Sequence, residues 1–153
     1  MRIKDATAEL GSGSGQINPM GALDPGLLYN NSMDYYIAFL CKEGYNRSII
    51  GILIGTKGLN CSPSQGTDGI NYPSMHTHII PSDASISTIF YRRVTNAGSR
   101  NSIYKAKVIA LKGLSIEIIP NTLNFGGVNQ ELSFKVVLKG PPMPKETDIF
   151  SIS

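Results

Sequence analysis

The sequence predicts a mainly β protein, an antiparallel β-sandwich preceded by a turn-rich loop and a short helical segment. Three observations predict it. From residue 71 onward, apolar and polar residues alternate in several short runs that are separated by glycine- and asparagine-containing turns. A single earlier run has helical spacing, and glycine and proline concentrate before residue 30. A period of two with one apolar face is typical of half-buried antiparallel strands.

The composition fits one ordinary domain, or a small domain with an appendage. The chain has 153 residues, of which 41% are hydrophobic and 16% charged, so it does not resemble a highly charged disordered chain. Its net charge of +3 is small, and its cations are dispersed apart from the pair Arg92 and Arg93, which lies inside an expected strand. A nucleic-acid groove needs clustered cations and stacking aromatics. We therefore expect no nucleic-acid partner.

The N-terminal residues MRIKDATAEL carry charged side chains and no apolar core of a signal peptide. The longest apolar run, 49–54, is interrupted by Gly51 and is far too short to span a bilayer. We therefore expect no export address and no membrane partner in this chain.

Residues 11–30, GSGSGQINPMGALDPGLLYN, are expected to form a turn-rich loop. The stretch contains the paired turn signals Asn18-Pro19 and Asp24-Pro25-Gly26. Its glycines match neither the dinucleotide-binding nor the P-loop pattern, and Ser14 does not lie in a G-x-S-x-G nucleophile elbow. These features favour a structural loop over a phosphate-binding or catalytic one.

The run SMDYYIAFLCKEG predicts a helix of about three turns. Ser32 or Asn31 is expected to cap its N-terminus, and Gly44 its C-terminus. A second short helix is expected near 48–54. The following residues of the first helix fall on one face, which we expect to be buried: Met33, Tyr36, Ile37, Leu40 and Cys41.

Short strands joined by turn signals indicate a sandwich of fibronectin or immunoglobulin type. Such a sandwich has about seven strands. We expect five or six here and therefore an incomplete sandwich. The expected strands lie near 74–80, 86–95, 102–109, 114–119, 123–125 and 131–139.

The cysteines and the glycosylation sequons suggest a secreted history, which the N-terminus contradicts. Cys41 and Cys61 would close a loop of about twenty residues if oxidised, although the residues alone leave a reduced pair open. Candidate glycosylation sites are Asn30, Asn46 and Asn60. Asn60 is the weakest of the three, because a disulfide at its neighbour Cys61 would hinder modification.

We expect no metal, no cofactor and no catalytic site. His76 and His78 would share one strand face, but a zinc site needs three or four ligands, and neither a third histidine nor an acidic cluster accompanies them. A serine hydrolase needs a base and an orienting carboxylate beside its nucleophile. With only two histidines, both on an expected outer strand, a complete triad is not expected.

Several motifs in order are specific: GSGQINPMGALDPGLLYN, DYYIAFLCKEGYN, Cys61, INYPS and RRVTNAGSRNSIYKAKV. Together they resemble the C-terminal part of plant subtilisin-like serine proteases of the cucumisin type, from Glu9 almost to the end of the chain. Ser12 stands where an aromatic residue is expected. The matching positions are Gly13, Gly15, Asn18, Pro19, Pro25, Gly26, Leu27, Tyr29, Asn71, Tyr72, Pro73, Asn96 and Gly98.

The resemblance implies a division of the chain into three parts. Residues 1–30 would be the C-terminal remnant of a subtilisin catalytic domain, 31–69 a helical, disulfide-linked connector, and 70–153 a fibronectin III-like domain truncated at its C-terminal end. It also implies a disulfide between Cys41 and Cys61. The chain has no tryptophan, although the family's next strand carries one, and 149–153 would only begin that strand.

The family's catalytic Asp, His and Ser and its oxyanion-hole Asn lie upstream of the matched region, so none is carried over to a residue here. The resemblance thus implies a non-catalytic C-terminal fragment of a secreted, extracellular endopeptidase. Its role would be structural, through packing in cis on the subtilisin catalytic domain, with a possible homodimer contact. The alternative is an independent binding module or decoy that engages a protease or cell-wall partner.

Overall fold

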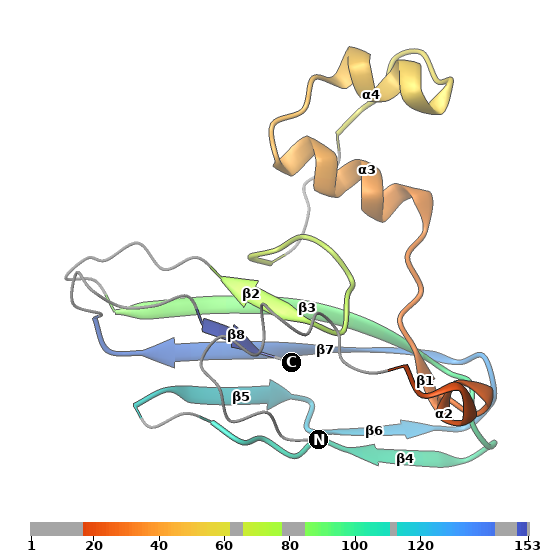
Figure 1. Ribbon diagram of the computed structural model, residues 1–153, viewed down its shortest axis with the longest axis vertical. Coiled ribbons are helices and arrows are strands. Elements are labelled where there is room, and N and C mark those ends of the chain that lie inside the picture. The colour runs from red at the N-terminus through yellow and green to blue at the C-terminus, as the bar shows by residue number, and fades with distance from the viewer. Residues whose placement is uncertain (1–16, 62–65, 78–84, 111–112, 143–149, 153) are drawn as a thin grey trace.

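The computed structural model describes residues 17–61, 66–77, 85–110, 113–142 and 150–152 (Figure 1). The described part is mainly β, as predicted. Figure 1 shows α3 and α4 projecting from one side of the strands, while β4 and β6 lie on the opposite side. In chain order, the elements are α2 (Pro19–Leu23), β1 (Leu27–Leu28), α3 (Met33–Lys42), α4 (Arg47–Ile54), β2 (Met75–Thr77), β3 (Ile86–Asn96), β4 (Ser102–Lys105), β5 (Ser115–Ile119), β6 (Thr122–Phe125), β7 (Glu131–Gly140) and β8 (Phe150–Ile152).

The long strands β3 and β7 form the centre of a four-stranded sheet of order β1-β3-β7-β5. Their antiparallel register runs from Ile86 opposite Gly140 to Thr95 opposite Glu131. The shorter pairs β4–β6 and β2–β8 are also antiparallel. The predicted antiparallel sheet architecture is therefore confirmed.

The core follows from the alternation of side chains along β3, whose burial repeats with a period of two. One cluster packs Phe90 against Met75 and Val136. The other packs Val94 against Leu123 and Phe125, with the sheets facing each other. Burial of such apolar side chains stabilises a fold by roughly 25 cal/mol per Å² of buried area.

The stretch 17–30 is more ordered than a loop, which corrects that expectation. The Asn18 side chain accepts a hydrogen bond from the Gly21 N–H at 3.1 Å and caps α2, which begins at Pro19. Proline suits the first helical position, because its missing N–H would have no partner there. The pair Leu27–Leu28 then joins the main sheet beside Asn96 and Thr95. Gly13, Ser14 and Gly15 lie outside the described residues.

The two helices occupy the predicted ranges, but the cap of α3 differs from the prediction. Ser32 takes the N-cap position without a side-chain hydrogen bond, and the Asn31 amide donates instead to the Asn71 carbonyl at 3.1 Å. Gly44, just beyond α3, has the expected left-handed conformation, with φ 84°. At α4, Asn46 accepts a hydrogen bond from the Ser48 N–H at 2.8 Å, and Gly55 ends the helix with φ 70°.

The expected burial of the α3 face is wrong at its start. Met33 remains 62% exposed and Tyr36 39% exposed, whereas Ile37, Leu40 and Cys41 are half-buried. The reason is that α3 projects from the strands, so the described residues leave part of its apolar face uncovered (Figure 1).

The strand expected at 102–109 ends at Lys105. Its partner β6 is only four residues long, and the pairing ends where Lys105 lies opposite Thr122. Beyond that point the Ala106 N–H donates to the Asn121 carbonyl at 2.8 Å, and Ile109 is 72% exposed. The alternation of apolar residues therefore continues farther than the ladder that would bury them.

Two distant motif segments meet at the turn after β3. The buried Asn96 side chain donates to the carbonyls of Ser99 and Gly127, both at 3.0 Å, and accepts from the Gly98 N–H at 3.1 Å. The Gly26 carbonyl accepts from the N–H groups of Ala97 at 2.8 Å and Gly98 at 3.0 Å. Asn96 thereby provides most of the hydrogen bonds that hold this turn.

Gly98→Ala is expected to lower the free energy of unfolding by about 1–3 kcal/mol, the usual cost of overpacking. A Cβ at this position would lie 2.9 Å from the Tyr104 hydroxyl, while its other neighbours lie at 3.5 Å. Urea unfolding measures the change. The matched control is Gly98→Ala in a Tyr104→Phe background, which lacks that oxygen and is expected to tolerate the methyl group. An equal loss in both backgrounds would contradict this explanation.

Candidate functional site: a polar junction between the helices and the sheet

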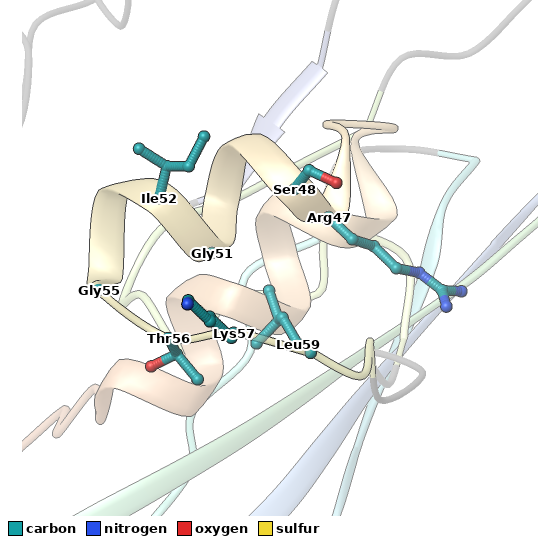
Figure 2. Close-up of a pocket in the computed structure, with 9 residues that line it drawn as sticks. Arg47, Ser48, Gly51, Ile52, Gly55, Thr56, Lys57 and Leu59 are labelled. Atoms are coloured by element: carbon teal, nitrogen blue, oxygen red, sulfur yellow. The ribbon is translucent and has the colours of Figure 1, made fainter.

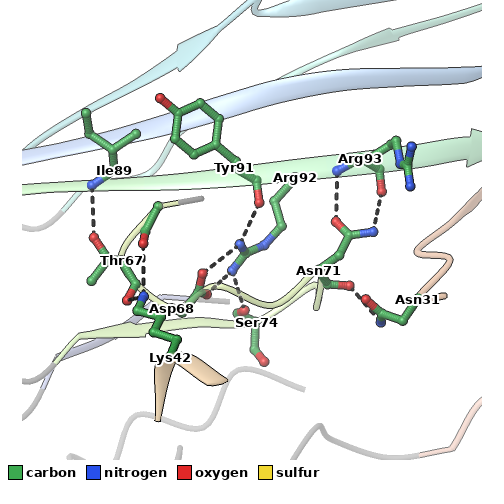
Figure 3. A network of polar contacts seen from close by, with 11 residues as sticks. Asn31, Lys42, Thr67, Asp68, Asn71, Ser74, Ile89, Tyr91, Arg92 and Arg93 are labelled. Carbon is green, nitrogen blue, oxygen red and sulfur yellow. Dashed lines mark hydrogen bonds and ion pairs between the residues drawn. The ribbon is translucent and has the colours of Figure 1, made fainter. Parts of the chain in front are cut away.

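The helices are joined to the sheet by a cluster of polar residues, most of them buried or half-buried, which we call the polar junction. Figure 3 shows Arg92 on β3 facing Asp68 and Ser74, and the backbone of Arg93 facing Asn71. The cluster comprises Asn31, Asp68, Asn71, Ser74, Arg92 and Arg93.

Arg92 is the buried centre of the polar junction. It occupies an inward position of β3, between Phe90 and Val94, and its side chain is fully buried. Its guanidinium binds Asp68 through both terminal nitrogens, with Nη1 at 3.1 Å from Oδ1 and Nη2 on Oδ2. Asp68 is itself only 7% exposed. A buried charge is tolerated only when it is paired and hydrogen-bonded, so the two residues depend on each other.

Arg92 also fixes backbone on both sides of the polar junction. Its Nη1 donates to the Tyr91 carbonyl at 2.8 Å, and its Nη2 donates to the Ser74 carbonyl at 3.1 Å. The guanidinium carbon lies 5.6 Å from the centre of the Phe90 ring, where a cation is attracted to the aromatic face. One side chain therefore links β3 to both Asp68 and Ser74.

Asn71 pairs with the edge of β3 as a strand would. Its Oδ1 accepts from the Arg93 N–H, and its Nδ2 donates to the Arg93 carbonyl, both at 2.8 Å. Thr67 pairs with Ile89 in a similar way. The Thr67 N–H donates to the Ile89 carbonyl at 2.8 Å, and the Thr67 hydroxyl accepts from the Ile89 N–H at 3.3 Å. An exposed sheet edge invites pairing with other chains. The segment 66–74 covers this edge with side-chain and backbone partners.

Five contacts connect α3 and its approach to this covered edge. The Asn31 side chain donates to the Asn71 backbone carbonyl at 3.1 Å. The Nδ2 atom of Asn71 donates in turn to the Asn30 carbonyl, also at 3.1 Å. Lys42 donates to the Gly66 carbonyl at 2.9 Å and to that of Thr67. The Arg93 guanidinium lies 5.1 Å from the centre of the Tyr35 ring. Both ends of α3 are thus tied to the sheet edge.

The predicted disulfide between Cys41 and Cys61 is confirmed. It joins the last turn of α3 to the segment that follows α4, with a Cα–Cα distance of 5.8 Å. The bridge closes the helical segment on itself before the chain reaches Asp68 and Asn71. The disulfide therefore holds α3 to the segment after α4, and the polar junction holds the next segment to β3.

Tyr29 closes the apolar side of the same region. It packs on the cluster of Val94, Leu123 and Phe125. Burial raises the pKa of its phenol above the usual 10.0, and the positive charge of Arg92 opposes part of that rise. Tyr29 therefore remains a neutral packing residue at physiological pH.

Two shallow hollows accompany the helices. Figure 2 shows the first, of about 540 Å³, between α4 and the turn 55–59, with Lys57 and Leu59 beneath the helix and Arg47 directed away. The second, of about 720 Å³, lies between α3 and the segment 67–77 and includes Tyr36 and Tyr72. Neither brings together a nucleophile, a base and an orienting acid. Among the described residues, no group of three or more His, Cys, Asp or Glu side chains could hold a metal ion.

The motif residues fall into two groups in space. Gly26, Asn96 and Gly98 meet at the turn after β3, and Asn71 belongs to the polar junction. Tyr72 and Pro73 are exposed beside it, while Asn18, Pro19 and Pro25 shape the approach to β1. His76 lies in β2 and His78 lies outside the described residues. The three sequon asparagines, Asn30, Asn46 and Asn60, are exposed.

The sequence analysis missed Arg92 and Asp68 as partners. Arg92 was noted only as half of an isolated cationic pair, although it falls in the inward phase of an expected strand. An arginine at an inward position requires a buried anion, and that signal was available. The sequence did not indicate which anion it would be, since Asp68 lies 24 residues away in a turn segment.

The chain was compared with known proteins. A family model described as fibronectin type-III domain matches residues 69–151. Subtilisin-like protease SBT4.15 of Arabidopsis thaliana is 45% identical over 150 residues, which are 92% of this chain and 20% of that protein. SBT4.14 and SBT4.12 of the same plant are 42% and 38% identical and cover 89% and 92% of the chain. The chain spans about a fifth of the length of these relatives.

No helix among the described residues is long and apolar enough to cross a membrane. The motifs that suggested a resemblance to the C-terminal part of plant subtilisin-like proteases are confirmed by these relatives, and the predicted fibronectin III-like fold is confirmed by the family model. The chain therefore belongs to the fibronectin type-III domain family and corresponds, over most of its length, to a segment of plant subtilisin-like proteases.

Proposed function

We propose that this chain is the non-catalytic accessory portion of a secreted plant subtilisin-like endopeptidase, in which it stabilises the catalytic domain. The observation that carries the proposal is the polar junction. It holds the α3–α4 segment in one orientation on the edge of β3. An elaborate rigid link of this kind is expected where a projecting segment must meet a second surface in a defined register.

Exposed apolar side chains on α2 and on α4, two helices that lie apart from each other, support the same proposal (Figure 1). In α2 and its approach, Ile17, Met20 and Leu23 are each at least 77% exposed, and in α4 Ile52 is 80% and Leu53 75% exposed. Large apolar side chains gathered on short helices mark an interaction surface. The occupant that fits is a subtilisin catalytic domain of the same polypeptide, because the relatives are about five times longer than this segment.

In this proposal residues 1–30 end the catalytic domain, 31–69 form the connector and 70–153 form the fibronectin III-like domain. The pairing of β1 with β3 places the end of the first part directly on the third. The disulfide and the sequons support an extracellular location, since disulfides persist in oxidising compartments.

The purified chain is expected to hydrolyse no peptide substrate. The sequence contains two histidines, and it lacks the Gly-Thr-Ser-Met-Ala nucleophile motif of the family that it resembles. The measurement is release of a fluorogenic group from peptide substrates, with and without a serine-directed phosphonate. Hydrolysis that the phosphonate blocks would contradict the non-catalytic assignment. Inhibition of a subtilisin-like protease by the added chain would indicate the decoy function instead.

The stabilising role can be tested in a complete enzyme. The corresponding segment of SBT4.15 is replaced by this chain, and thermal inactivation and kcat/KM are measured. We expect an active chimera whose half-life at elevated temperature falls when Arg92→Met is introduced, with kcat/KM retained at low temperature. The matched control is Arg100→Met, because Arg100 is exposed and lies outside the polar junction. A half-life that is the same in all three chimeras would contradict the proposal.

A further inference from the structure

The three sequon asparagines have different surroundings, although all of them are exposed. Asn46 is the N-cap of α4, Asn30 borders the polar junction, and Asn60 precedes a disulfide-bonded cysteine. Transfer of a glycan joins a sugar to the amide nitrogen of asparagine. The surroundings of that nitrogen and of the serine two residues later therefore decide which sequon is compatible with the fold.

Asn46 can carry a glycan without losing its role in the helix. The cap uses the Oδ1 atom, which accepts from the Ser48 N–H at 2.8 Å, while a glycan would be attached to Nδ2. The backbone at Asn46 is extended, with φ −64° and ψ 130°. The same hydrogen bond places Asn46 beside Ser48, the third residue of the sequon. Figure 2 shows Ser48 in the first turn of α4, and both residues are exposed.

The place of α4 in the molecule also suits a bulky modification. Figure 1 shows α4 at the end of the projecting segment, far from the paired strands. A sugar at the start of α4 would displace no contact of the polar junction. By contrast, the Asn30 carbonyl accepts a hydrogen bond from the Asn71 side-chain amide, and the half-buried Asn31 side chain donates to the Asn71 carbonyl.

Asn60 is constrained by its neighbour. Cys61, the middle residue of the sequon, is bonded to Cys41 at the end of α3. Once this bridge has formed, the sequon is held against the helix and cannot extend freely into an enzyme site. Oxidation of Cys61 and modification of Asn60 therefore compete.

We propose that Asn46 is an N-glycosylation site and that the Cys41–Cys61 disulfide keeps Asn60 unmodified. The inference rests on the proposed secretory route. An oligosaccharide on a lipid diphosphate is the donor. A bond forms between the anomeric carbon and Nδ2 of Asn46, the bond from that carbon to the diphosphate oxygen breaks, the amide loses one proton, and the lipid diphosphate leaves.

The test expresses the full chain behind a signal peptide in plant cells and locates glycans by mass spectrometry of peptides treated with a glycan-releasing amidase. We expect a glycan at Asn46 and none at Asn60. Ser48→Ala and Asn46→Asp are each expected to remove the Asn46 glycan. Both variants retain the cap, because Ser48→Ala leaves the backbone N–H and Asn46→Asp keeps an oxygen acceptor.

Cys41→Ala supplies the second arm, because it frees Cys61 and is expected to raise the modified fraction at Asn60 several-fold. Glycan transfer and disulfide formation both act on the chain as it enters the oxidising compartment, so a poorly folding variant still gives a readout. An unmodified Asn46 in the secreted wild-type chain would overturn the assignment, and full modification of Asn60 beside an intact disulfide would overturn the competition. The SBT4.15 chimera is assayed separately, so failure of the glycan assignment leaves the test of the accessory role intact.

Discussion

Arg92→Met is expected to lower the free energy of unfolding by about 3–5 kcal/mol, the usual cost of removing one partner of a buried ion pair. The reason is that Asp68, whose side chain is only 7% exposed, would be left buried without the guanidinium that binds both of its oxygens. The carbonyls of Tyr91 and Ser74 would lose their donors as well. Urea unfolding followed by circular dichroism measures the change.

The neighbouring arginine provides the matched control for this prediction. Arg93 makes the same kind of ion pair with Glu131 at 3.3 Å, but both side chains are more than a third exposed. Exposed pairs contribute roughly 0–1 kcal/mol, so Arg93→Met should cost far less than Arg92→Met. The double variant Arg92→Met with Asp68→Leu should recover much of the loss, because no unpaired charge remains. Equal costs for the two single variants would contradict the central role of Arg92.

The double variant Cys41→Ala, Cys61→Ala is expected to lower the free energy of unfolding by about 3 kcal/mol. The bridge joins residues separated by 20 positions, and its loss enlarges the conformational freedom of the unfolded chain. Hydrogen exchange should accelerate first in α3 and α4, because the disulfide joins these helices and not the strands. The backbone amides that hydrogen-bond between β3 and β7 should remain protected from hydrogen exchange at low denaturant.

Reduction of the wild-type chain checks the same prediction without substitution. Reduced wild-type protein and the double variant should unfold at similar urea concentrations, both below the oxidised protein. An unchanged midpoint after complete reduction would show that the helical segment is held by the polar junction alone. Combining the cysteine variant with Arg92→Met would then reveal whether the two links act independently.

Much of the fold follows from the sequence because local periodicity reports which face of an element is buried. The alternation in 86–95 and 131–139 corresponds to β3 and β7 within a residue at each end, and the run at 48–54 corresponds to α4. The resemblance to subtilisin-like proteases implied the pairing of Cys41 with Cys61. These inferences depend on residues close in sequence or on an ordered set of motifs.

The errors in prediction occurred where the partner of a segment decides its state. Ala106 and Val108 continue the alternation of Tyr104, yet β4 ends at Lys105, where its pairing with β6 ends. Leu27 and Leu28 became a strand because the edge of β3 beside Thr95 and Asn96 accepts them. The apolar face of α3 remained partly exposed because no described segment covers Met33 and Tyr36 fully.

By itself, the sequence determined the strand periods, the helical segment and the family of the chain, since these are properties of neighbouring residues and of motif order. The tertiary structure decided which polar groups meet. Asp68 is the anion for Arg92, and Asn71 covers the strand edge at Arg93. Those pairs are separated by 24 and 22 residues. A buried charge or an open edge specifies that a partner is needed, whereas only the folded path of the chain selects which residue supplies it.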